Sequence, residues 1–195
     1  MLVHTTENFP MKRFWNASRL GMAALASIAL LGGCASVTPM DYRGEKPTLK
    51  LEHYFNGPLT ADGIVFNRAG KAVRRFHVDM VGVWHGDEGT LTENFTYSNG
   101  AKQVRVWTLR RVPGEHGERR YQGTAADVAG TASGYAEGNA FNWRYTLLLP
   151  VGGTTYHVQM DDWMYQMDEH VLLNRTVMTK FGFEVASIFI AFHKP

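Results

Sequence analysis

Cysteine, proline and net charge are all scarce in this chain of 195 residues, and each scarcity excludes a class of protein. The single cysteine, Cys34, leaves no partner for a disulfide within the chain. Seven prolines beside 20 glycines exclude a collagen-like or proline-rich chain. Of the 20 basic and 18 acidic residues, three and one precede Cys34, which leaves 17 of each in the remainder. A body without net charge argues against nucleic-acid binding.

Sequence signatures of catalysis and of metal binding are missing as well. The chain has no Gly-x-Ser-x-Gly nucleophile elbow, no phosphate-binding P-loop and no His-Glu-x-x-His zinc motif. Its eight histidines are dispersed, and no two of them have the i, i+2 spacing of one strand face. We therefore predict no catalytic residue, no metal site and no cofactor. The hydrophobic residues, 45% of the chain, are nevertheless enough to bury a core.

The N-terminal segment has the layout of a secretory signal. Basic residues between Lys12 and Arg19 are followed by Leu20–Gly33, a run without any charge. This run is shorter than the ~20 apolar residues of a membrane-spanning helix. We predict that residues 1–33 are a signal peptide and that residues 1–10 precede its true start at Met11.

The end of this segment resembles a bacterial lipobox. In such signals a peptidase cuts before a cysteine whose thiol receives a diacylglycerol, and Leu31-Gly32-Gly33-Cys34 has that form. The resemblance implies that Cys34 is lipidated and anchors the protein to a membrane. No aspartate follows Cys34, which is similar to signals for the outer membrane and implies a place in the cell envelope, facing the periplasm. The alternative for a lone cysteine is a buried core side chain.

The remainder shows the alternation of an all-β domain. Residues 34–47 are interpreted as the lipidated cysteine and a polar tether, and residues 48–195 as one domain. Period-two runs are separated by turns such as Ser98-Asn99-Gly100, whose Asn-Gly pair suits a tight hairpin. The predicted strands are Leu59–Asn67, Lys71–Trp84, Thr90–Tyr97, Lys102–Val112, Arg119–Ala126, Gly130–Glu137, Ala140–Leu149, Thr154–Tyr165, Val171–Lys180 and Glu184–His193.

These strands predict a single antiparallel up-and-down β-barrel of about 8–10 strands. The gaps between strands are too short for parallel crossovers, and closure leaves no exposed sheet edge. One face of each long strand is strongly apolar and rich in aromatic side chains. In Lys71–Trp84 this face begins at Phe76, and in Ala140–Leu149 it begins at Phe141. Pointed inward, such faces fill a barrel or line a cavity for one small ligand.

Two resemblances to known families support this fold. The segment Leu49–Gly57 is similar to the opening of lipocalins, in which a short leucine-tyrosine segment and a glycine precede the first strand. More of the chain resembles the DUF3833 family of bacterial lipoproteins, which implies a lipocalin-like barrel and an envelope location but no activity. The matching stretches are Tyr54–Gly57, Arg75-Phe76, Val106–Leu109, Tyr121–Ala125, Gly138–Tyr145, Asp161–Met164, Asn174-Arg175 and Lys180–Gly182.

The best candidate site lies on three consecutive late strands. Trp143 is on the aromatic face of its strand, and the next two strands carry Asp161-Asp162-Trp163 and Asn174-Arg175. We expect an inward aspartate to meet Arg175 or Arg144, because a carboxylate and an arginine polarise one another in a low-dielectric cavity. The alternative is a salt bridge that only closes the barrel end. The candidate ligand-binding residues are Trp143, Arg144, Tyr145, Asp162, Trp163 and Arg175.

The sequence therefore favours a monomeric, lipid-anchored envelope protein whose barrel binds a small hydrophobic or amphipathic ligand. A fatty acyl chain or another lipid-derived molecule is the preferred ligand, because aromatic-lined cavities suit apolar molecules. Two alternatives remain open. One is a barrel-fold enzyme, an isomerase or hydrolase for a lipid-derived substrate, that uses Asp161 or Asp162 with Arg175. The other is a structural envelope protein with a filled barrel and no ligand.

Overall fold

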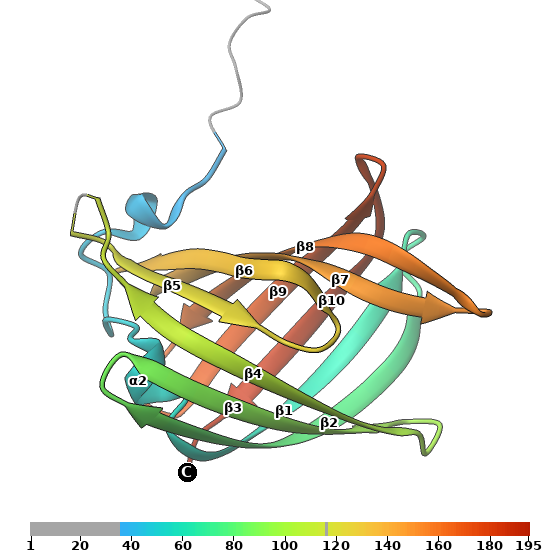
Figure 1. The fold of residues 1–195 in the computed structure, drawn as a ribbon, viewed down its shortest axis with the longest axis horizontal. Coiled ribbons are helices and arrows are strands. Elements are labelled where there is room, and N and C mark those ends of the chain that lie inside the picture. Colours follow the sequence, from blue (N-terminus) through green and yellow to red (C-terminus); the bar gives the residue numbers. More distant parts are fainter. Residues whose placement is uncertain (1–35, 116) are drawn as a thin grey trace, which may run out of the picture. The chain divides into compact units, whose positions relative to one another are not determined.

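Ten antiparallel strands close into a barrel in the part of the chain that the structure describes. The structure is a computed structural model, and it describes residues 36–115 and 117–195. Each strand pairs with its neighbours in sequence, and β1 pairs with β10 to close the sheet (Figure 1). The strands are β1 (Gly57–Asn67), β2 (Ala72–His85), β3 (Glu88–Tyr97), β4 (Lys102–Val112), β5 (Arg119–Thr124), β6 (Val128–Glu137), β7 (Ala140–Val151), β8 (Thr154–Gln166), β9 (Val171–Lys180) and β10 (Phe183–His193).

The predicted fold class is confirmed, and all ten predicted strands are found to within a few residues. The alternation also places the side chains as expected. Phe76, Val78 and Met80 of β2 are buried inside the barrel, whereas Val81 and Val83 on the opposite face are exposed. The pleat of a strand sends successive side chains to opposite faces, so the apolar period of two identifies the inner face of β2.

One end of the barrel is closed by α2 (Leu51–Tyr54), a single helical turn before β1. The hydroxyl of Tyr54 donates to the carbonyls of His170 (3.0 Å) and Phe192 (3.2 Å), which ties the turn to the last two strands. On the other side, Trp84 Nε1 donates to the carbonyl of Phe55 (3.2 Å). That carbonyl lies so close to Gly82 that a Cβ at position 82 would collide with it. Only glycine therefore allows the end of α2 to pack against β2 here.

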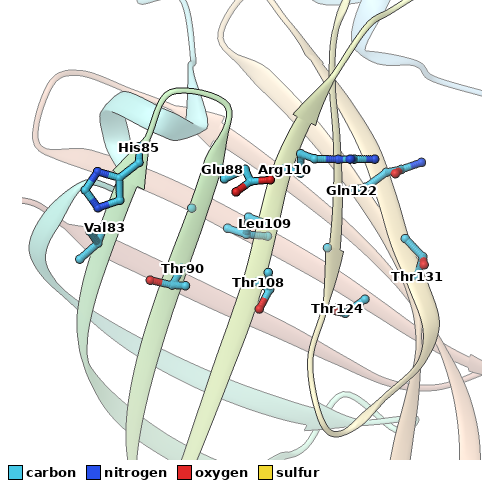
Figure 2. A pocket seen from close by; sticks show the side chains of 12 residues that line it. Val83, His85, Glu88, Thr90, Thr108, Leu109, Arg110, Gln122, Thr124 and Thr131 are labelled. Atoms are coloured by element: carbon cyan, nitrogen blue, oxygen red, sulfur yellow. The ribbon is translucent and has the colours of Figure 1, made fainter.

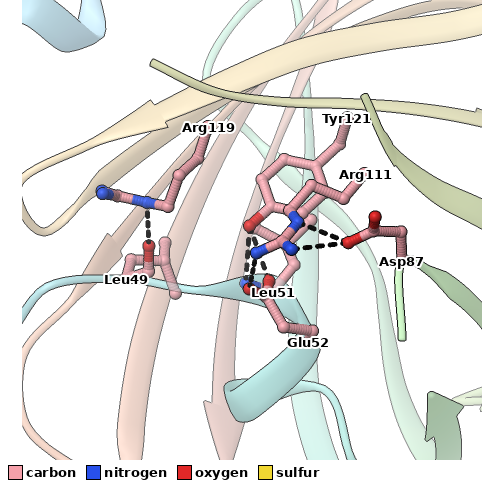
Figure 3. A network of polar contacts seen from close by, with 7 residues as sticks. All are labelled: Leu49, Leu51, Glu52, Asp87, Arg111, Arg119 and Tyr121. Carbon is pink, nitrogen blue, oxygen red and sulfur yellow. Dashed lines mark hydrogen bonds and ion pairs between the residues drawn. The ribbon is translucent and has the colours of Figure 1, made fainter. Parts of the chain in front are cut away.

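A polar network holds α2 against the early strands (Figure 3). Glu52 accepts hydrogen bonds from the Tyr121 hydroxyl (2.7 Å) and from Arg111 Nη1 (3.1 Å). Arg111 also pairs with Asp87 through Nη2 at 2.6 Å, and Arg119 Nε donates to the carbonyl of Leu49 (3.2 Å). The half-buried Glu52 is thus compensated from two strands, and we call the end that α2 seals the closed end.

The segment before α2 is packed and not a free tether. The compact unit that contains the barrel runs from Thr38 to Pro195, so it begins earlier than residue 48. The 3-10 helix η2 (Pro39–Tyr42) contacts β6 and β7, Pro39 is buried, and Tyr42 packs edge-on against Tyr165 at 5.3 Å. Aromatic contacts of this kind give a short polar segment enough buried area to dock. All ten strands lie within Thr38–Pro195, and their pairing closes on itself, so the sheet and its core need no residue outside this unit.

The opposite end, which we call the mouth, is formed by the turns around residues 67–71, 98–101, 125–127, 150–153 and 181–182. Its wall is incomplete beside β5, because β5 has six residues and pairs with β4 only from Thr108 to Val112. The half of β4 nearest the mouth therefore has no β5 partner, and the Arg105–Asp127 ion pair bridges this gap (2.7 Å).

No helix among the described residues has the length and hydropathy needed to cross a bilayer. The signal peptide and the lipidated Cys34 that the sequence predicts lie outside the described residues.

Candidate functional site

The interior of the barrel holds a cavity of about 910 Å³. Volumes of this size are typical of sites for small organic ligands. Leu51 and Phe55 form its floor at the closed end, and exposed residues such as Val73 and Pro150 border it at the mouth. The walls carry aromatic and aliphatic side chains from β2, β3, β4, β7, β8, β9 and β10, among them Phe76, Phe95, Trp107, Trp143, Met160, Met178, Ile188 and Phe192.

A small group of charged side chains interrupts this apolar lining. Arg105 of β4 donates to Asp127 through Nε (3.0 Å) and Nη2 (2.7 Å), a forked geometry that fixes the guanidinium. The guanidinium also lies over the rings of Phe95 (5.6 Å) and Trp107 (5.9 Å). Glu93 of β3 is only 9% exposed, and its Oε2 lies 3.8 Å from Arg105 Nη1, too far for a hydrogen bond. Asp127 therefore holds the Nε and Nη2 side of Arg105, whereas Nη1 makes no hydrogen bond to Glu93.

A second buried carboxyl, Asp162 of β8, faces the same cavity. Its exposed fraction is 7%, and its neighbours on β9 are Asn174 and Thr176, which hydrogen bond to each other (3.0 Å). Burial raises the pKa of Asp162 to about 6, against the opposing influences of Thr176, Arg105 and Tyr145. Burial likewise raises the pKa of Glu93 to about 7, against the attraction of Arg105. Both carboxyls are thus partly protonated near neutral pH.

Two carboxyl oxygens of this group are buried without a hydrogen-bond partner. They are Oε2 of Glu93 and Oδ1 of Asp162, and both residues line the cavity. An unpaired buried acceptor costs about 1–3 kcal/mol, so such atoms indicate a missing donor. Three carboxyls stand here against one arginine, and the site therefore suits a group that donates hydrogen bonds or carries positive charge.

A second hollow, of about 520 Å³, lies on the outer wall over β2 to β6 (Figure 2). Its lining includes the outward side chains of Val83, His85, Arg110 and Gln122, together with several threonines. These side chains are exposed, and no buried polar atom without a partner lies among them. The interior cavity is therefore the stronger candidate site. Within residues 36–115 and 117–195 no cluster of three or more His, Cys, Asp or Glu side chains is arranged to hold a metal ion.

Three of the candidate residues lie where the sequence places them. Trp143, Tyr145 and Asp162 all line the cavity, and Trp143 is the register partner of Asp162 on the adjacent strand. Trp143 also packs edge-on against Trp107 at 5.9 Å.

The other three candidates point away from the cavity. Arg144 is on the outer face, where it pairs with Asp161 (3.2 Å). Trp163 stacks on Tyr165 outside the barrel, and Arg175 is exposed opposite Trp163. The expected contact between Asp162 and Arg175 is therefore wrong. Asp162 is in register with Thr176, so the pleat turns the preceding residue to the other face.

Arg105, Glu93 and Asp127 did not enter the sequence-derived site. Two of them leave a signal in the sequence, because Arg105 shares a strand face with Trp107 and Leu109, and Glu93 stands between Leu91 and Phe95 on another. A charge on an apolar strand face is unexpected unless it is paired or functional. Asp127 lies in the turn between β5 and β6, where no periodicity reveals its direction.

Comparisons with known proteins agree with this architecture. The profile of the family described as "Protein of unknown function (DUF3833)" matches residues 28–194. A solved structure of the S-type phycobiliprotein lyase CPES from Guillardia theta resembles this one with a TM-score of 0.52 and 8% sequence identity. The match covers 75% of this chain and 93% of that chain, and at such low identity it shows the lipocalin-like fold alone. A search of curated proteins found no match.

Proposed function

This chain belongs to the DUF3833 family, and we propose that its barrel binds a small amphipathic molecule derived from a lipid. The observation that carries the proposal is the cavity of about 910 Å³, in which apolar walls surround two buried carboxyl oxygens without donors. A cavity with an apolar lining and a few convergent polar groups is the usual form of a ligand site. The likeness of the fold to a phycobiliprotein lyase also suggests a small ligand.

The polar group narrows the chemistry of the ligand. An acyl chain fits the apolar walls, and its polar end would meet Glu93 and Asp162. A free carboxylate there would face two partly ionised carboxyls, while the charge of Arg105 is already balanced by Asp127. A hydroxyl, amide or ammonium group would instead supply the donors that these oxygens lack. We therefore favour an acyl chain with a donor at its polar end over a free fatty acid.

Filling the cavity should abolish this binding. Met178 of β9 lines the cavity, and Met178→Trp is expected to weaken the affinity for monolauroylglycerol by about tenfold or more, because the indole occupies the ligand's space. The affinity can be measured by calorimetry, and native mass spectrometry shows whether a lipid copurifies. Leu173→Trp is the matched control, because Leu173 lies on the outer face of the same strand.

Laurate serves as the second probe. If laurate binds more tightly than monolauroylglycerol, the argument for a hydrogen-bond donor on the ligand is wrong. If the Met178→Trp variant binds both probes as tightly as the wild type does, the cavity is not their binding site. If neither probe binds and no lipid copurifies, the binding function itself is wrong.

The proposed place of action is the cell envelope, with the protein anchored through Cys34. The ordered basic region, apolar run and Leu31-Gly32-Gly33-Cys34 motif support this anchor, and the outer membrane facing the periplasm is the proposed location. We expect Cys34→Ser to remain an uncleaved precursor without acyl label, because the thiol is the acceptor. Metabolic labelling with radioactive palmitate checks this. Label retained in Cys34→Ser, with Ser36→Ala as the control, would disprove the anchor.

A further inference from the structure

The hairpin between β9 and β10 carries two exposed aromatic side chains at the mouth of the barrel. Phe181 is 87% exposed and Phe183 is 67% exposed. The Nζ of Lys180 lies 4.5 Å from the centre of the Phe181 ring and 5.1 Å from that of Tyr156 on the neighbouring strand. This hairpin and the β7–β8 hairpin beside it, with exposed Val151, project at the mouth (Figure 1).

The backbone makes Phe181 an unusual choice for this turn. Its φ is +52°, and within the described residues it is the only non-glycine residue with a positive φ. A bulky side chain is strained in this region, where glycine or asparagine is normally found. The ring gains little packing in return, because it is almost fully exposed. A strained backbone at an exposed aromatic residue indicates that the side chain serves in binding and not in stabilising the fold.

Charge at the mouth is predominantly positive. The turns and strand ends there carry five basic residues against two acidic ones, and one of the two, Asp127, is already paired with Arg105. Arg68, Lys71 and Lys102 are exposed and form no ion pair within the described part of the chain. The five basic residues are Arg68, Lys71, Arg74, Lys102 and Lys180, and the acidic ones are Asp127 and Glu184.

The closed end lacks this excess of positive charge, because the basic residues Arg43, Lys46, Lys50, Arg120 and Lys194 lie there among a larger number of carboxyls. Its loops between strands (residues 85–88, 111–119, 137–139 and 166–171) carry seven carboxyls against two arginines. An excess of positive charge at one end attracts that end to an anionic surface. The carboxyls are Asp87, Glu88, Glu115, Glu118, Glu137, Asp168 and Glu169, and the arginines are Arg111 and Arg119.

We propose that the mouth docks onto an anionic phospholipid surface, with Phe181 and Phe183 inserted at the level of the headgroups. Exposed aromatic side chains beside basic ones are the usual means by which a protein binds at a bilayer interface, since the rings enter the interface and the cations attract the phosphates. The cavity opens at this same end, so docking places its entrance against the lipid. This partner is additional to the proposed ligand, and docking stands whether or not the cavity binds one.

The test uses Thr38–Pro195, which contains the whole barrel and lacks both the apolar N-terminal run and Cys34. Sedimentation with vesicles of phosphatidylcholine and phosphatidylglycerol measures docking. We expect the double variant Phe181→Asn, Phe183→Ser to bind these vesicles about tenfold more weakly or worse. Asparagine at position 181 suits the positive φ, so the hairpin keeps its turn. Leu173→Ser removes an exposed apolar side chain from the outer wall near the closed end and should bind normally.

A second variant separates attraction by charge from insertion. Lys71→Glu, Lys102→Glu should weaken binding to these anionic vesicles and have little effect on vesicles of phosphatidylcholine alone, and high salt should act in the same way. Unchanged sedimentation of both mouth variants would overturn the proposal. The proposal is also wrong if the wild type does not bind the vesicles but forms dimers that the double aromatic variant does not form. The aromatic surface would then bind a second copy of the chain. Monolauroylglycerol binding by the variants is measured separately, so failure of docking is distinguishable from failure of ligand binding.

Discussion

Arg105→Met is expected to lower the free energy of unfolding by about 3–5 kcal/mol, because it leaves Asp127 and Glu93 without their cation in a low-dielectric cavity. The guanidinium makes three hydrogen bonds to Asp127, and its side chain is only 16% exposed. The same change also removes the Arg105–Asp127 ion pair, which among the described residues is the only ion pair across the gap beside β5. Urea denaturation followed by circular dichroism measures the loss.

Arg144→Met is the matched control for this experiment. Arg144 also pairs with an aspartate, but its side chain is 61% exposed, and exposed pairs contribute at most about 1 kcal/mol. A double variant, Arg105→Met with Asp127→Asn, should recover part of the stability, because no uncompensated charge then remains at that pair. Equal effects of Arg105→Met and Arg144→Met would show that the interior pair is not structural.

The second large effect concerns pH. The pKa of Glu93 is raised from 4.5 to about 7 and that of Asp162 from 3.8 to about 6, mainly by burial. Between these values the folded protein binds more protons than the unfolded chain, so the stabilising contribution is complete at about pH 4 and is lost as pH rises through 6 and 7. Each group corresponds to about 3 kcal/mol over this window.

Glu93→Gln and Asp162→Asn should therefore each flatten the decline in stability between pH 4 and 8. The difference between the unfolding free energies of variant and wild type, measured across this range, isolates the contribution of one carboxyl. Glu88→Gln, a change at an exposed position of the same strand as Glu93, provides the control. A difference curve for Glu93→Gln that is as flat as that of Glu88→Gln would mean that Glu93 is not protonated by burial.

The fold could be predicted from local sequence patterns, because in a meander barrel each strand pairs with the strands next to it in sequence. The period of two gave strands such as β2 their inner face, and turns such as Ser98-Asn99-Gly100 gave the strand ends. The packed segment from Pro39 to Pro47 was not predicted, since its docking depends on Tyr42 meeting Tyr165, more than a hundred residues away. No local signal carries such a contact.

The site was only half visible in the sequence for a related reason. Asp162, Trp143 and Tyr145 lie on adjacent strands, where register alone brings them together. Arg105 and Glu93 approach this group across the barrel, and their distance from it depends on how the sheet closes. The error over Arg175 has a different origin, since apolar residues occur on both faces of β9 and the period of two does not identify its inner face.

The chain enters the barrel at the closed end, where the backbone around Tyr42 lies against Gly138 of the β6–β7 turn. Tilted strands of this length make a barrel about 25–30 Å tall. The entrance to the cavity and the point where the chain enters the barrel are at opposite ends, so about this height separates them. A molecule can therefore enter or leave the cavity at the mouth without displacing the packed segment that leads into the barrel.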